Sequence, residues 1–429
     1  MNILISAAKA ITIKSLISSK KARQIGSLYV SMILGILLGI GVSVATTRLL
    51  DPSQFGDLKF LQSLFSFAVI FPTLGIFYSG STLIAQNKNE HIKHQLIGNL
   101  LIYAAVISAL FIIAIFIFSF FQDRIFNNQL GAIIRVISPL IFVFPLQICL
   151  ENIMQGDNRI YELSIFRVSP QICYLVCIMI FNFFIPLSTT SALAIQLISF
   201  AIIIMIAIFR LDPSLGNMLE NLTIIWRTNR TYGFPVYLGA ISGVATSYLG
   251  GLAIGYFIDN TNVGLYALAQ TVTLPLAIIP TSAGTALYKE FANVSAIPKK
   301  ATAVTLLLSI SALLFFCLII KKVVLMLYSI DYIAAVQLSY GLAIGSTLRG
   351  FGDYFNRFLG SHGRGKQLRN GAIVTGISNV AGYIVLVYYF GVNGAVITNV
   401  VSYFIYLSMM YYYYNKFRQE VCAKQIVCQ

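Results

Sequence analysis

Apolar stretches of about 20 residues recur along the whole chain, each long enough as a helix to cross a hydrocarbon core roughly 30 Å thick. The 429 residues are 58% hydrophobic and only 10% charged, whereas soluble domains carry charges on about a quarter of their residues. A membrane barrel would instead show alternating strands of about ten residues. We therefore predict an all-α integral membrane protein.

Hydropathy predicts about twelve transmembrane helices, and the hydrophilic segment 210–231 divides six of them from the other six. An even number of spans gives both halves the same orientation, so a parallel pseudo-twofold repeat is expected, with two six-helix lobes around a central cavity. The predicted spans are 26–47, 58–79, 96–121, 131–153, 162–185, 189–209, 232–256, 263–287, 301–320, 332–358, 369–390 and 393–414.

The spans define the predicted organisation of the chain. Within the linker, apolar residues at three- and four-residue spacing precede Arg227 and Arg230, which predicts an amphipathic helix on the cytoplasmic interface with Trp226 as its anchor. The predicted parts are a basic cytoplasmic N-terminal segment (1–24), an N lobe (25–209), the linker (210–231), a C lobe (232–415) and a cytoplasmic tail (416–429).

One passage occurs twice and supports a duplication. Residues 48–73 align without a gap on residues 256–281, which lie 208 positions later. Six of the 26 aligned positions are identical, which exceeds the roughly two that random pairing gives, although a shared apolar bias inflates such matches. The identical pairs are Asp51/Asp259, Gly56/Gly264, Gln62/Gln270, Ile70/Ile278, Pro72/Pro280 and Thr73/Thr281.

The formal charge of +15 reports orientation and does not indicate a nucleic-acid partner. Lys and Arg concentrate in the loops on the side of the N-terminus, which the positive-inside rule places in the cytoplasm together with the C-terminus. The loops on the opposite side hold only Arg48, Arg124, Lys321 and Lys322.

Among the charged residues within the predicted spans, five are singled out as candidates for burial in the bilayer: Arg135, Arg167, Arg349, Asp353 and Arg357. An arginine at the bilayer centre costs roughly 2.5 to 3.5 kcal/mol, so such residues usually face the bundle interior or water. The four arginines are candidate contacts for an anionic substrate in a cavity, because guanidinium binds phosphate oxygens bidentately. In the structural alternative, Arg349 and Asp353 neutralise each other one turn apart, and the remaining arginines reach the membrane surfaces.

Two homologous halves in a membrane suggest a transporter, and two further predictions concern transport. Asp353 is a candidate for ion coupling or for charge pairing with a neighbouring arginine. Pro72 and Pro280 occupy equivalent positions of the repeat, and because proline kinks a helix they are candidate hinges. Ordinary bending and packing of membrane helices is the alternative for both prolines.

No catalytic or metal-binding constellation is present in the sequence. His91, His94 and His362 fall in predicted cytoplasmic loops, and there is no phosphate-binding glycine loop. We therefore predict that the chain is not an enzyme and binds no cofactor or metal, and that a proton or sodium gradient drives it.

Four short segments carry a resemblance to a known family. Residues 49–56 (LLDPSQFG), 232–235 (YGFP), 263–269 (VGLYALA) and 390–395 (FGVNGA) occur in order along the chain. They resemble the Wzx-type O-antigen and polysaccharide biosynthesis flippases of the multidrug/oligosaccharidyl-lipid/polysaccharide (MOP) exporter superfamily, over about residues 24–415.

This resemblance implies two six-helix lobes around a cationic cavity, and alternating access coupled to an ion gradient. It implies that the substrate is an undecaprenyl-pyrophosphate-linked oligosaccharide, moved from the cytoplasmic to the outer leaflet of a bacterial inner membrane. Membrane lipids, a polysaccharide polymerase and a chain-length regulator are the other partners considered. With such a substrate, the four arginines are expected to contact the pyrophosphate or an anionic sugar. Cavity residues diverge in this family, so the arginine assignments rest on this chain alone.

Two alternatives stay open. A multidrug or cation antiporter of the same superfamily would use acidic residues for cationic drugs, whereas this chain offers arginines. The second is a non-transporting membrane scaffold of a glycan assembly complex. Large extramembrane domains are absent from the sequence, which counts against a polymerase.

Overall fold

The computed structural model describes residues 20–427, and within that range every regular element is helical. The first half contains α2 (Lys20–Leu49), α3 (Pro52–Ala68), α4 (Ile70–Thr73), α5 (Ile76–Gln86), α6 (Glu90–Phe126), α7 (Gly131–Ile137), η1 (Ser138–Phe142), α8 (Val143–Gly156), α9 (Ile160–Phe184) and α10 (Thr189–Leu211). The second half contains α11 (Met218–Thr228), η2 (Asn229–Gly233), α12 (Phe234–Phe257), α13 (Asn260–Ala286), α14 (Tyr288–Phe291), α15 (Lys299–Leu327), η3 (Ile330–Tyr332), α16 (Ala334–Ser361) and α17 (Gly365–Val427).

The helices confirm the predicted all-α membrane fold. Within the described residues, eight helices are long and apolar enough to cross a membrane, or nine when the bent pair Pro52–Thr73 and Ile76–Gln86 counts as one span. The helix α17 joins the last two predicted spans across a kink at Gly391, whose φ of 61° favours glycine. The helices α12 and α16 occupy the seventh and tenth predicted spans.

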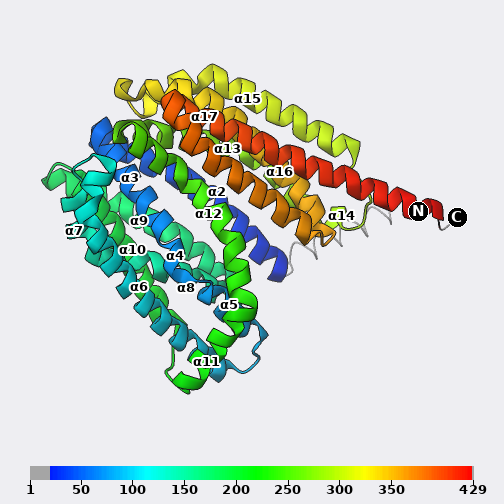
Figure 1. The fold of residues 1–429 in the computed structure, drawn as a ribbon, viewed down its shortest axis with the longest axis horizontal. Coiled ribbons are helices and arrows are strands. Elements are labelled where there is room, and N and C mark those ends of the chain that lie inside the picture. Colours follow the sequence, from blue (N-terminus) through cyan, green and yellow to red (C-terminus); the bar gives the residue numbers. More distant parts are fainter. Residues whose placement is uncertain (1–19, 428–429) are drawn as a thin grey trace.

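Figure 1 shows two bundles that lie against each other, one containing α6, α7, α9 and α10, the other α13, α15, α16 and α17. The first helix of each half packs on the fifth span of the same half: α2 lies along α9, and α12 along α17. The bundles meet where α3 contacts α12 and α13. Most of the predicted basic segment, residues 1–24, lies outside the described residues, and the chain from residue 416 continues α17 as helix to Val427.

The duplicated passage lies at this interface. Asp51 caps the N-terminus of α3 and Asp259 that of α13, each accepting a backbone N–H at 2.8 Å, as an N-cap aspartate does. Gly56 and Gly264 then bring the two helices into backbone contact, because a Cβ on Gly56 would lie 2.0 Å from the Asn260 carbonyl oxygen. The repeat therefore supplies equivalent caps and equivalent contacts to both lobes.

The two candidate hinge prolines differ in their surroundings. After Pro72 the chain adopts left-handed backbone at Leu74 (φ 45°) and Gly75 (φ 82°), and α5 leaves at 64° to the preceding helix. Pro280 lies inside α13, which continues to Ala286. Equivalent prolines thus accompany a broken helix in one lobe and an unbroken one in the other, and their role as hinges stays a prediction.

The break after Pro72 is held by the segment that leads into the C lobe. The buried Asn229 of η2 donates to the Leu74 carbonyl oxygen and accepts from the Ser79 hydroxyl, both at 3.1 Å. The backbones of Gly75 and Gly233 touch beside it, where a Cβ on either would overlap the other's carbonyl oxygen. The hydrogen bond from Asn229 satisfies the Leu74 carbonyl group, which the helix break exposes.

Candidate functional site

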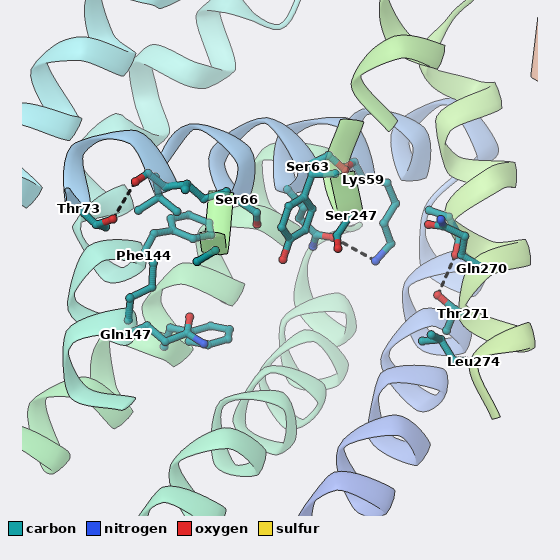
Figure 2. Close-up of a pocket in the computed structure, with 18 of the residues that line it drawn as sticks. Lys59, Ser63, Ser66, Thr73, Phe144, Gln147, Ser247, Gln270, Thr271 and Leu274 are labelled. Atoms are coloured by element: carbon teal, nitrogen blue, oxygen red, sulfur yellow. Dashed lines mark hydrogen bonds between the residues drawn. The ribbon is translucent and has the colours of Figure 1, made fainter. Parts of the chain in front are cut away.

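A cavity of about 830 Å³ lies between the two bundles, lined by both halves of the chain. Figure 2 shows side chains from several helices around it, among them Lys59, Ser63 and Gln147 of the first half, and Gln270 and Thr271 of the second. Amides, hydroxyls and aromatic rings make up much of its wall. Further lining residues of these kinds are Tyr78, Phe144, Asn152, Gln196, Phe200, Ser247, Ser346, Tyr383, Asn399 and Tyr403.

The duplicated passage forms two walls of this cavity. The lining positions along α3 follow helical spacing. The equivalent positions of the repeat on α13, 208 residues later, line the cavity as well. At several of these positions the two copies carry different types of side chain. The equivalent pairs are Lys59/Ala267, Gln62/Gln270, Ser63/Thr271, Ser66/Leu274 and Val69/Ala277.

The charge of the cavity is entirely positive among its described lining residues. Lys59 comes from α3 in the N lobe and Arg349 from α16 in the C lobe, and no lining residue is Asp or Glu. Within residues 20–427, no group of three His, Cys, Asp or Glu side chains is placed to hold a metal ion. The cavity wall therefore suits an anion with hydroxyl groups better than a cation.

Lys59 is held by amides instead of a carboxylate. Its Nζ donates to Gln62 Oε1 at 3.1 Å, and Gln62 Nε2 donates to Gln196 Oε1 at 2.7 Å. The ammonium also lies 5.3 Å from the centre of the Phe55 ring, a cation–π contact. Lys59 makes no ion pair with any residue in the described part of the chain, so its charge is not cancelled locally.

Arg349 is exposed within the cavity and lies over the Tyr403 ring, 5.7 Å from its centre. The Asp353 carboxylate accepts a hydrogen bond from the Tyr406 hydroxyl at 3.0 Å and forms no ion pair with Arg349 among the described residues. Asp353 is not one of the lining residues. Arg349 and Asp353 lie one turn apart on α16 but differ in their surroundings, since Arg349 lines the cavity and Asp353 is held by a neighbouring helix.

The structure does not bring the four candidate arginines together. Arg357 follows Arg349 by eight residues, about 12 Å along the helix, and is exposed near the end of α16 without lining the cavity. Arg135 lies 5.0 Å from the centre of the Phe120 ring, whose side chain is 60% exposed on the outside of the bundle. Neither arginine has a place in the cavity wall.

Arg167 has a carboxylate partner that its own span does not contain. Its guanidinium donates to Glu151 Oε2 through Nε at 3.0 Å and through a terminal nitrogen at 2.7 Å. Glu151 belongs to α8, and the lining residue Gln147 donates to its other oxygen at 3.3 Å. The pair joins two different spans, so no pattern within either span indicates it.

Sequence reasoning also missed Lys59. Hydropathy placed the start of the second span at residue 58, whereas α3 begins at Pro52 and puts Lys59 two turns inside the helix. The signal was present as a polar stripe at positions 59, 62, 63 and 66 of an otherwise apolar segment. This spacing places all four side chains on one helix face.

Known structures share this architecture. The model matches "Lipid II flippase MurJ, inward closed conformation" with a TM-score of 0.72 and 12% identity, over 93% of this chain and 90% of that chain. An inward-facing multidrug resistance MATE family transporter of the MOP superfamily gives a TM-score of 0.66 and 16% identity, over 92% and 99%. At these identities the likeness shows the fold alone.

A third similar structure is a MOP superfamily transporter from Pyrococcus furiosus, described as having a binding pocket of reverse polarity, with a TM-score of 0.56 and 16% identity over 94% of this chain and 98% of that one. The comparison with curated proteins gave no match. A family model described as "Polysaccharide biosynthesis protein" matches residues 22–295, more than half of the chain. The chain therefore belongs to the polysaccharide biosynthesis protein family.

Proposed function

We propose that this protein is a flippase for undecaprenyl-pyrophosphate-linked oligosaccharide, the repeat unit of O-antigen or a related surface polysaccharide. It moves this substrate from the cytoplasmic to the outer leaflet of a bacterial inner membrane by ion-coupled alternating access, with both termini in the cytoplasm. The observation that carries the proposal is the cavity wall, with one cation from each lobe and no carboxylate among its described lining residues. The family match supports the glycan part of it.

The two parts of the substrate headgroup fit two kinds of lining residue. Lys59 and Arg349 supply positive charge for the pyrophosphate, because charge-assisted hydrogen bonds to phosphate are strong and short. Amides such as Gln147 and Asn152, with the Phe144 ring, supply hydrogen bonds and an apolar face for sugar rings. The lipid tail stays in the bilayer between the lobes.

The lobes are closed at the end of the bundle where α2 turns into α3. In the predicted topology this end faces outward, so this conformation corresponds to an inward-facing or closed state of the proposed cycle. The lobes are joined there by hydrogen bonds from Arg48 to the Leu327 carbonyl oxygen at 2.8 Å and to that of Met326, from Tyr332 to the Leu50 carbonyl oxygen at 3.3 Å, and from Asn260 to Asp57 at 2.7 Å.

The test compares charge removal inside and outside the cavity. Lys59→Gln and Arg349→Gln each remove one cavity cation, and Arg357→Gln removes an equivalent charge from the same helix as Arg349 outside the cavity. Hydrogen bonds to charged groups contribute about 1.5 to 3 kcal/mol. We therefore expect each cavity variant to lower flipping of a lipid-linked oligosaccharide in reconstituted vesicles at least about tenfold, and Arg357→Gln to remain near wild type.

Surface glycan in cells, normalised to the amount of protein in the membrane, gives the second measurement. Normal glycan in both cavity variants at normal protein levels would refute the role of the cavity cations. If the protein exported cationic drugs and its removal left surface glycan unchanged, the antiporter would be favoured. If a variant whose lobes are cross-linked shut still supported normal glycan assembly, a scaffold would be favoured. Loss of flipping when a proton gradient collapses but a sodium gradient persists would identify the proton as the coupling ion.

A further inference from the structure

We propose that Lys59, Gln62 and Gln196 form one anion-binding unit of the N lobe, in which Gln62 is a positioning residue and Gln196 supplies a second hydrogen-bond donor to a phosphate group. The inference rests on the proposed function and specifies which groups of this lobe contact the phosphate. It is carried by the chain of hydrogen bonds from Lys59 to Gln62 and from Gln62 to Gln196.

The ammonium fixes the orientation of both amides. A lysine side chain donates hydrogen bonds and accepts none, so the Gln62 atom that faces it is the oxygen. The Gln62 nitrogen then faces Gln196 at 2.7 Å, and because it also only donates, Gln196 must present its oxygen. The amide nitrogen of Gln196 is left for the cavity, which Gln196 lines.

The unit joins two helices of one lobe. Lys59 and Gln62 lie one turn apart on α3, and Gln196 lies on α10, 134 positions from Gln62. The Phe55 ring lies one turn before Lys59. A lysine side chain loses conformational freedom when a ligand immobilises it, and this loss weakens binding. Because Gln62 already restricts Lys59, part of that cost is met before the anion binds.

The duplication supplies an internal control for this arrangement. Gln270 is the repeat equivalent of Gln62 and also lines the cavity, but the position equivalent to Lys59 is Ala267. At these equivalent positions, the C lobe therefore has the glutamine but lacks the lysine. Replacing Gln62 or Gln270 by Met removes the same polar group from equivalent helices, and only the first change removes a contact with a cation.

The experiment is a double-mutant cycle on the full-length protein in detergent, with inorganic pyrophosphate as the probe. Its dissociation constant is obtained from the dependence of the unfolding temperature on pyrophosphate concentration. We expect Gln62→Met to weaken binding about threefold to tenfold when Lys59 is present and less than about twofold in the Lys59→Gln background. Gln270→Met should change binding less than about twofold in both backgrounds.

A merely structural role of Gln62 would lower the unfolding temperature without ligand and would weaken binding equally in both backgrounds, which would overturn the inference. Equal losses for Gln62→Met and Gln270→Met would do the same. Gln196→Met should also weaken pyrophosphate binding, and unchanged binding would remove Gln196 from the unit. If Lys59→Gln itself leaves pyrophosphate binding unchanged, the anion site of the proposed function fails; a Lys59 effect without coupling to Gln62 defeats only the positioning role.

Discussion

The backbone contact between α3 and α13 gives a sharp prediction. Gly56 of α3 and Gly264 of α13 are repeat equivalents that touch through their backbones. A Cβ on Gly56 would lie 2.0 Å from the Asn260 carbonyl oxygen and 2.9 Å from Thr261 Cα, whereas ordinary contact starts at 3.4 Å. Both atoms belong to backbone, so no side-chain rotation relieves the overlap. Gly56→Ala should therefore force the two helices apart.

The size of the effect follows from the overlap alone. Overpacking costs about 1 to 3 kcal/mol, and a clash with rigid backbone takes the upper value. Alanine also has a higher helix propensity than glycine, but α3 is a helix whether or not the lobes touch, so this gain stabilises both states equally. The cost to the state with the lobes in contact is therefore about 3 kcal/mol, which shifts the equilibrium toward separated lobes roughly 150-fold. Gly264→Ala should act more weakly, because its nearest atom would be Gly56 Cα at 2.9 Å.

Distances between one spin label on α3 and one on α13, measured by pulsed electron resonance in nanodiscs, report the two states. Gly39→Ala on α2 is the matched control, because a Cβ there would meet no atom within 4 Å. We expect a longer-distance population to rise in the order Gly39→Ala, Gly264→Ala, Gly56→Ala. If Gly56→Ala gave the same distance distribution as Gly39→Ala, the close approach of these glycines would not control the contact between the lobes.

Two further predictions concern buried and paired polar groups. Asn229→Leu leaves the Leu74 carbonyl and the Ser79 hydroxyl without their amide partner, so unfolding in detergent should become easier by about 1 to 3 kcal/mol; an unchanged midpoint would argue against a role of this contact in holding the helix break. Arg167→Gln removes a partly exposed pair with Glu151, for which about 0 to 1 kcal/mol is expected. Oligosaccharide flipping should stay near wild type, and a tenfold loss would return Arg167 to the list of substrate contacts.

Much of the fold was predictable because it depends on local properties of the chain. Span length and hydropathy act within one helix, so the membrane class and the positions of the spans follow from them. Asp51 and Asp259 are N-caps by virtue of residues only three positions away. The break after Pro72 was harder to predict from the sequence, because it combines left-handed backbone at Leu74 and Gly75 with a contact from another helix.

The candidate site was predicted only in part. Cation excess and a central cavity followed from the sequence and the family resemblance, but of the four arginines named only Arg349 lines the cavity. The residue that sequence reasoning passed over, Lys59, lies in the repeat itself. The two cavity cations therefore come from different parts of the sequence, Lys59 from the repeat and Arg349 from outside it.

The sequence by itself determined the class of protein, its helical spans and its duplication, because hydrophobic length and residue identity depend only on the order of residues along the chain. Only the tertiary structure decided which charges face the cavity and which are neutralised. Arg167 acquires Glu151 from another helix, and Gln62, which lies one turn from Lys59 on the same helix, acquires Gln196 from α10. Such partners depend on the rotation and neighbours of each helix, and the packing of the whole bundle sets these.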